Sequence, residues 1–240
     1  MAKTSAHIVG SIKRFVPVPL KRAVARRLPA RLWHHVDPEW HRKAVGGLWE
    51  TIGTLQFDLL VREGLEPNDR LLDIGCGSLR GGVLFIEYLD QGHYVGIDKS
   101  AERLAAGRDV ELPAAKLVHK EPTLEVLEDF EFETLGQTFD YAIALSLFTH
   151  LPPELIARCL ARVSPVLEPG ARLFATFLEV DDDEQQRTID RSERLYAKDP
   201  NFWYSFSELQ AACEGSGLTP EYVGDWGHPR DQQLAVFTKD

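Results

Sequence analysis

The chain has 240 residues, of which 44% are hydrophobic and 10% aromatic, and this is enough apolar material to bury a full core. Its formal net charge is −10, but residues 1–45 hold ten Lys and Arg against two acids, which leaves −18 for residues 46–240. An acidic body repels the phosphate backbone, so nucleic acid is not expected as a partner.

The cysteines are three in number and far apart, at Cys76, Cys159 and Cys213. This spacing favours neither a disulfide framework nor a thiolate zinc site, and it fits a reducing compartment. No uncharged apolar run approaches the roughly 20 residues that a membrane span needs, and the apolar patch before Lys13 is too short for a secretory signal. We therefore expect a cytoplasmic protein.

The first predicted helix of the main body lies within residues 46–65, where leucine and isoleucine recur at helical spacing. Trp49 and Phe57 on this helix are expected to pack in the core. Gln56 is the better candidate for a polar contact with a cofactor.

Strands and helices alternate from residue 69 onward. Short apolar runs predict strands at residues 69–76, 93–98, 115–120, 139–146 and 171–180. Amphipathic runs predict helices at residues 80–90, 99–110, 123–130 and 152–167. Apolar strands alternating with helices are typical of a mostly parallel sheet with helices on both faces, so the predicted fold class is α/β.

The segment "LLDIGCGSLRGG", residues 71–82, passes from a buried strand into four glycines. Glycine in such a turn lets backbone amides approach a ligand closely, because a Cβ would block both the approach and the φ angles required. The loop therefore predicts a site for a nucleotide-like cofactor, with a tight turn that binds nothing as the alternative.

The spacing of this loop differs from that of dinucleotide enzymes. Its glycines read Gly75-x-Gly77-x-x-x-Gly81 rather than Gly-x-Gly-x-x-Gly. Asp73 precedes them at the strand's end, where a pyrophosphate would be repelled but an α-amino group or a sulfonium would be attracted. Asp98 ends the next strand beside the same crevice, where a carboxylate can accept hydrogen bonds from two ribose hydroxyls.

These residues resemble the class I S-adenosylmethionine-dependent methyltransferases. "LLDIGCGSLRGG", "YVGIDKS" and "FDYAIALSLFTHL" are similar to that family's first, second and fourth-strand motifs, in the family's order, and the likeness covers residues 47–238. The segments "GGLWETIGTLQFDLLVREGL" and "GHPRDQQLAVF" resemble a bacterial subgroup whose substrates are mostly unassigned.

The resemblance implies a Rossmann-like fold with a seven-stranded, mostly parallel sheet. Its last two strands would be residues 219–226 and 232–240, joined by the loop "GHPRD", with the final strand antiparallel. The implied cofactor is S-adenosyl-L-methionine, and the residues that would bind it include Ser146 at the end of the fourth strand. The others are Asp73, Gly75, Cys76, Gly77, Asp98 and Lys99, together with Gln56 from the preceding helix.

One part of the family's pattern has no clear counterpart. Many members have an acid after the third strand that accepts a hydrogen bond from the adenine amino group. The sequence there reads "LVHKEP", which offers Lys120 or Glu121.

Three residues are candidates for acceptor binding or catalysis. His150 follows the fourth strand and titrates in the useful range, although it could equally pack at or cap a helix start. His228 and Arg230 lie in the loop between the last two strands, where Arg230 could hold a carboxylate or phosphate bidentately. Either of these two could instead be a solvated loop residue.

Residues 180–204 form an insertion after the fifth strand, and we expect it to act as a lid over the acceptor. Its acids, Asp181, Asp182 and Asp183, have no partner ligands elsewhere in the sequence, so no metal is predicted. Phe202, Trp203 and Tyr204 could supply an apolar wall or pack in the core.

Residues 1–45 are treated as a basic leader and residues 46–240 as the methyltransferase domain. "PLKRAVARRLP" predicts a short basic amphipathic helix that could lie on an anionic membrane through residues 1–36, at the inner face of the cell membrane. The alternatives are an organelle-targeting peptide or docking on the acidic body of the same chain.

The function predicted from the sequence is methyl transfer from S-adenosylmethionine to oxygen or nitrogen of a small molecule that carries an anionic group. One alternative is a non-catalytic S-adenosylmethionine-binding module recruited to a membrane or an acidic partner. Another is an NAD(P)-dependent oxidoreductase, which Asp73 and the loop spacing disfavour. The acceptor and the oligomeric state are not readable from the sequence.

Overall fold

The computed structural model describes residue 37, residues 39–180 and residues 201–240. The chain divides into two compact units, Met1–Trp49 and Glu50–Asp240. The predictions for residues 1–36 and for the acids at 181–183 concern residues outside the described part, as does most of the predicted lid. Within the described part, no helix is long and apolar enough to cross a membrane.

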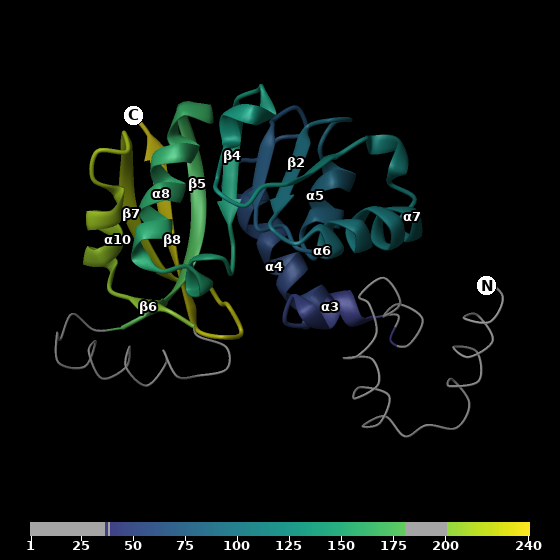
Figure 1. Ribbon diagram of the computed structural model, residues 1–240, viewed down its shortest axis with the longest axis horizontal. Coiled ribbons are helices and arrows are strands. Elements are labelled where there is room, and N and C mark those ends of the chain that lie inside the picture. The colour runs from purple at the N-terminus through teal and green to yellow at the C-terminus, as the bar shows by residue number, and fades with distance from the viewer. Residues whose placement is uncertain (1–36, 38, 181–200) are drawn as a thin grey trace, which may run out of the picture. The chain divides into compact units, whose positions relative to one another are not determined.

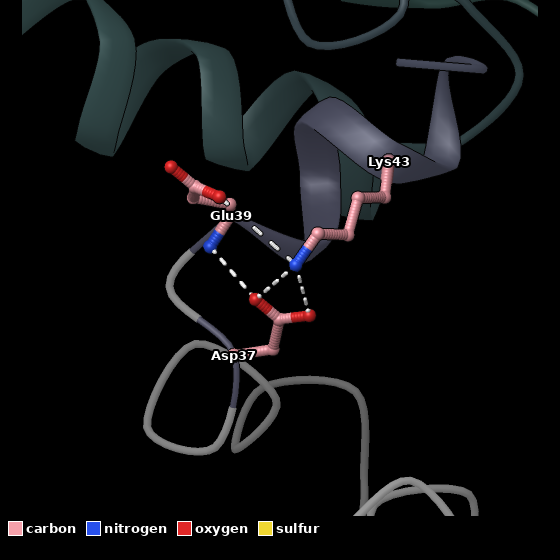
Figure 2. A network of polar contacts seen from close by, with 3 residues as sticks. All are labelled: Asp37, Glu39 and Lys43. Carbon is pink, nitrogen blue, oxygen red and sulfur yellow. Dashed lines mark hydrogen bonds and ion pairs between the residues drawn. The ribbon is translucent and has the colours of Figure 1, made fainter. Parts of the chain in front are cut away.

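The described part of the first unit contains the short helix α3 (Trp40–Ala44). The Asp37 carboxylate accepts hydrogen bonds from the backbone N–H of Glu39 at 3.2 Å and from Lys43 Nζ at 2.8 and 2.9 Å, which ties the chain before α3 to its last turn (Figure 2). His41 is buried against the edge of the Trp49 ring, with ring centroids 6.2 Å apart. These contacts hold a helix too short to be stable by itself.

The second unit contains the sheet with strand order β3-β2-β1-β4-β5-β8-β7, and a two-residue strand, β6, pairs with β5 (Figure 1). The strands are β1 (Leu71–Ile74), β2 (Tyr94–Asp98), β3 (Thr123–Val126), β4 (Phe139–Ala144), β5 (Leu167–Glu179), β6 (Trp203–Tyr204), β7 (Leu218–Asp225) and β8 (Gln232–Lys239). β8 runs antiparallel to β5 and β7, whereas the other strand pairs are parallel. This order and the antiparallel final strand confirm the predicted Rossmann-like methyltransferase fold.

Helices cover both faces of the sheet, as predicted. They are α4 (Trp49–Arg62), α5 (Gly82–Tyr88), α6 (Ala101–Ala106), α7 (Leu112–Ala114), α8 (Pro153–Val163) and α10 (Phe206–Cys213), with the π-helix η2 (Gly107–Glu111) continuing α6. Successive strand side chains point to opposite faces. Leu72 and Ile74 therefore join one core cluster with α8 and α10, whereas Leu71 joins a second with α4, α5 and α6.

The pairing register of β1 with β2 and β4 shows where the candidate site residues lie in the sheet. Asp73 on β1 lies beside Gly96 on β2 and Ile143 on β4, and all three strands are parallel. Their carboxyl ends therefore meet at one edge of the sheet, and the amino end of the antiparallel β8 reaches the same edge. In open α/β sheets, ligands bind in the crevice outside such strand ends.

The third strand was predicted in the wrong place. Residues 115–120 do not form a strand, because Lys116 and Glu121 have positive φ angles of 61° and 49° and Val118–Lys120 form a 3₁₀ turn. The strand is instead β3, where a short helix had been predicted. Only Leu124 of β3 is buried, so this edge strand lacks the apolar run that marks the inner strands.

The structure corrects the predicted start of β5 and decides between the two roles predicted for Phe202 and Tyr204. Residues 168–170, which lie between the predicted helix at 152–167 and the predicted strand at 171–180, belong to β5. Phe202 packs against the core cluster and Tyr204 is buried within it, donating a hydrogen bond to the carbonyl of Leu151. Core packing is therefore the role of these two aromatic residues.

Candidate active site at the carboxyl edge of the sheet

Asp73 is a buried carboxylic acid at the end of β1. The hydroxyl of Tyr94, on β2, donates a 2.6 Å hydrogen bond to Asp73 Oδ2. Burial raises the pKa of Asp73 to about 7; the nearby charge of Asp98 adds to the rise, while the Tyr94 bond and the positive Arg80 oppose it. A cation arriving here would favour the ionised form, which is the chemistry expected of a ligand's ammonium group.

The glycine loop that follows Asp73 folds back onto β2. The backbone N–H groups of Gly75 and Cys76 donate to the Ile97 carbonyl at 2.8 and 3.0 Å. Gly75 has φ of +82°, and a Cβ there would lie 3.1 Å from a methyl of Leu147. Glycine is needed at this position because of both the positive φ angle and the short distance to Leu147.

Asp98, at the end of β2, is held in place by the same loop. Its Oδ2 accepts from the backbone N–H of Gly77 at 3.0 Å and its Oδ1 from that of Ser100 at 2.8 Å, with Arg103 Nη1 3.7 Å from Oδ1. A carboxylate has about four lone-pair positions. Acceptor capacity therefore remains for two ribose hydroxyls.

Ser146 follows β4 with a positive φ of 59°, and it belongs to a hydroxyl and amide network. Its backbone N–H donates to Thr176 Oγ1 at 2.6 Å, and its Oγ donates to Gln232 Oε1 at 3.1 Å. Thr176 Oγ1 also donates to Gln232 Oε1, at 2.8 Å. The network joins the ends of β4, β5 and β8.

The loop between β7 and β8 is rigidly built. Trp226 Nε1 donates to the Gln232 carbonyl at 2.9 Å, and the Trp226 ring stacks on His228 with centroids 5.4 Å apart. The backbone N–H of Arg230 donates to His228 Nδ1 at 3.3 Å. Burial lowers the pKa of His228 to about 4, helped by the charges of Arg80 and Arg230 and opposed by Asp231. The imidazole is thus neutral at pH 7.

Arg80 connects the two halves of the site. It lies in the glycine loop and is only 8% exposed. Burial lowers its pKa to about 10, the charge of Arg230 lowers it further and Asp73 raises it. Arg80 therefore interacts electrostatically with Asp73, His228 and Arg230, although the last two follow it in sequence by about 150 residues.

The remaining predicted residues lie in different settings. Gln56 is buried beside the loop, since a Cβ on Gly81 would come within 2.5 Å of Gln56 Oε1. Cys76 is buried and its pKa is raised well above the usual thiol value by burial, which makes it an unreactive thiol. Lys99 and His150 are exposed, with His150 at the end of a 3₁₀ turn.

The corrected third strand changes the candidates for the adenine contact. Lys120 Nζ donates to the carbonyl of Leu89, and Glu121 accepts from Gln91, so both serve local structure. The acids that follow β3 are Glu128 and Asp129. Asp129 forms an ion pair with Arg158.

Sequence reasoning missed Arg80, Thr176 and Gln232. Thr176 and Gln232 are buried polar residues in otherwise apolar strands, which was the available signal. Their network spans up to 86 residues of sequence, from Ser146 to Gln232, so the partners could not be paired before the fold was known. Residues 37, 39–180 and 201–240 contain no group of three or more His, Cys, Asp or Glu arranged to hold a metal ion.

The residues present fit S-adenosylmethionine. A buried carboxylate with a pKa of about 7 lies beside the glycine loop, and a second carboxylate with free lone pairs lies one strand away. The first suits the α-amino group of the cofactor and the second its ribose hydroxyls.

Comparison with known proteins agrees with this geometry. Residues 72–173 match a methyltransferase domain family. A 125-residue stretch is 32% identical to a ubiquinone biosynthesis O-methyltransferase of Hahella chejuensis, covering 51% of this chain and 49% of that protein. The chain spans about half the length of the curated relatives it matches.

Solved structures share the fold at low identity. Magnesium protoporphyrin IX methyltransferase from Synechocystis PCC 6803, solved with bound S-adenosylhomocysteine, has a TM-score of 0.58 at 14% identity, covering 80% of this chain and 85% of that one. The [4+2]-cyclase SpnF has a TM-score of 0.56 at 17% identity, covering 77% and 80%. In its motifs and its sheet order the chain resembles the class I S-adenosylmethionine-dependent methyltransferases, and its residues 72–173 match the methyltransferase domain family.

Proposed function

We propose that this protein transfers the methyl group of S-adenosylmethionine to an oxygen or nitrogen atom of a small molecule with an anionic group. The cofactor supplies a methyl carbon that its sulfonium has already activated. The protein's task is then to bind, orient and desolvate the two reactants.

The observation that carries the proposal is the pair of buried carboxylates at the ends of β1 and β2. Asp73 binds the ammonium group, and Asp98 accepts from the ribose hydroxyls while holding the loop through Gly77. Gln56 and Ser146 border the methionine side of the site. Glu128 or Asp129 accepts from the adenine amino group.

The anionic acceptor is supported by the positive charge at the other half of the site. Arg80 is buried and Arg230 lies on the adjoining hairpin, and each lowers the pKa of His228. Two cations held this close favour an anion between or beside them. The name of the Hahella chejuensis relative supports oxygen as the methylated atom.

Two alternative functions can be weighed against methyl transfer. The likeness to a [4+2]-cyclase supports the alternative that the chain binds S-adenosylmethionine without using its methyl group. An NAD(P)-dependent reaction is disfavoured, because Asp73 would repel a pyrophosphate at the glycine loop.

Label transfer separates these functions. The protein is incubated with S-adenosylmethionine labelled in its methyl group and the small-molecule fraction of cells that carry the gene. We expect label in an organic product and equimolar S-adenosylhomocysteine. Tight binding of S-adenosylhomocysteine without any transfer of label would favour the binding module instead.

A further inference from the structure

Gln232 presents a hydrogen-bond donor at the site with its orientation fixed. It is only 6% exposed, and its Oε1 accepts from both Ser146 Oγ and Thr176 Oγ1. Thr176 Oγ1 already accepts from a backbone N–H, so its own hydrogen is free to donate to Gln232. The Gln232 Nε2 is left with no hydrogen-bond partner anywhere in the part of the chain that the structure describes.

His228 presents a second donor from the same hairpin. Its Nδ1 accepts the Arg230 N–H, so in the neutral ring the proton is assigned to Nε2. This Nε2 is buried and, among the described residues, has no hydrogen-bond partner. A buried N–H without a partner is costly, and an acceptor atom supplied by a ligand would remove that cost.

Positive charge lies near the His228 donor. Among the described residues, the charges of Arg80 and Arg230 lower the pKa of His228 and that of Asp231 raises it. Asp73 already accepts from Tyr94 and faces the cofactor's ammonium in the proposed function. The exposed His150 belongs to the 3₁₀ turn after β4 rather than to this hairpin. The cluster thus offers donors and cations to an acceptor but no general base.

We propose that His228 Nε2 and Gln232 Nε2 bind the reacting oxygen of the acceptor, and that this oxygen is one of a carboxylate. The inference rests on the proposed function. A carboxylate lone pair forms the new O–CH₃ bond, the C–S bond breaks with its electrons going to sulfur, and the sulfonium becomes a neutral thioether. The acceptor carries no proton that must leave, so the product is a methyl ester and no base is required.

Binding of benzoate and benzamide, in the presence of saturating S-adenosylhomocysteine, tests the donor pair by ligand-observed NMR titration. We expect wild-type protein to bind benzoate at least tenfold more tightly than benzamide. Gln232→Glu keeps the oxygen that Ser146 and Thr176 hold but removes the donor, and His228→Phe keeps the ring that stacks on Trp226. Both should weaken benzoate binding at least tenfold and leave S-adenosylhomocysteine affinity within threefold.

The matched control is Gln233→Glu, which places the same charge on the next residue, whose Nε2 donates only to the Asp231 carbonyl. It should change neither affinity. Equal binding of benzoate and benzamide, including no binding of either, would overturn the proposal. So would variants that lose S-adenosylhomocysteine but keep 5′-methylthioadenosine, since the donors would then serve the cofactor's own carboxylate.

The labelled product distinguishes this inference from the proposed function. A methyl ester releases its label as volatile methanol in mild alkali, and we expect this of the product formed in the label-transfer experiment. Alkali-stable label would refute the carboxylate as nucleophile and leave methyl transfer standing. Failure of the protein to bind S-adenosylhomocysteine at all would refute the proposed function itself.

Discussion

At the scale of single residues, Asp73 is a buried carboxylic acid whose ionised form is unfavourable in the absence of a cation. A carboxyl group with a pKa near 7 is half neutral at pH 7, so ionising it costs free energy until a cation binds. Tyr94 offsets part of this cost through its 2.6 Å hydrogen bond. The residue is therefore poorly suited to stability and well suited to binding an ammonium group.

Asp73→Asn is expected to stabilise the ligand-free protein at pH 8 and to weaken S-adenosylhomocysteine binding at least tenfold. Because the folded-state pKa of Asp73 is raised from 3.8 to about 7, its contribution to stability is present below pH 3.8 and is lost as the pH rises to 7. At 1.36 kcal/mol per pKa unit, this loss is on the order of 4 kcal/mol. Urea unfolding at pH 5 and pH 8 measures the part lost above pH 5, which is about two pKa units or roughly 3 kcal/mol.

The gain from Asp73→Asn should be larger at pH 8 than at pH 5, because wild-type Asp73 is mostly protonated at the lower pH. A variant less stable than wild type at pH 8 would contradict the assigned pKa. Retention of full cofactor affinity would contradict the assigned role.

At the scale of elements, the glycine loop is fixed by close packing against α4. A Cβ on Gly53, within α4, would lie 2.6 Å from the carbonyl oxygen of Arg80, which is backbone and cannot rotate away. The helix therefore approaches the loop as closely as it does only because residue 53 is glycine. Any substitution there must move the helix, the loop or both.

Gly53→Ala is expected to destabilise the protein by about 1–3 kcal/mol, as overpacking does, although alanine gains about 1 kcal/mol in helix propensity. Cofactor affinity should fall with it, since Arg80 belongs to the loop. Thr54→Ala is the control, because it raises propensity at an exposed position of the same helix. A Gly53→Ala variant as stable as wild type, measured by urea unfolding, would show that the contact is not tight.

The corrected position of β3 gives a second prediction for the elements. Replacing Glu128 and Asp129 together by Gln and Asn should weaken S-adenosylhomocysteine binding about tenfold or more, as expected for one hydrogen bond to a charged group. Replacing Lys120 and Glu121 together by Gln should have little effect. The reverse pattern in calorimetric titration would restore the adenine contact to residues 120 and 121.

The inner strands could be predicted from sequence because both of their faces are buried, as in β1 and β2, which have no exposed position. The edge strand β3 could not, since its single buried residue gives no pattern. Asp73 and Asp98 were predictable because they end strands that must be neighbours. The role of Gln232 was not predictable, because the orientation of its amide depends on hydroxyl groups of residues 56 and 86 positions away in the sequence.

At the scale of the whole molecule, the second unit divides the chemistry between two parts of one sheet edge. Residues 73–103, on the β1 and β2 side, supply the groups assigned to the cofactor. His228, Arg230 and Gln232, on the β8 side, supply the groups assigned to the acceptor, and Thr176 holds Gln232 through a hydrogen bond. Arg80 reaches both, since Asp73 and Arg230 each act on its pKa. The membrane contact through residues 1–36 stays a prediction.

The central claim, that this edge binds S-adenosylmethionine, is tested most directly by calorimetric titration with S-adenosylhomocysteine and with NAD. We predict that wild-type protein binds S-adenosylhomocysteine and does not measurably bind NAD. Asp98→Ala should lose most of that affinity, because two ribose hydrogen bonds to a charged acceptor contribute about 1.5–3 kcal/mol each. Glu102→Ala, which removes an exposed acid from α6, should bind normally. Binding of NAD in preference, or unchanged affinity in Asp98→Ala, would contradict the account.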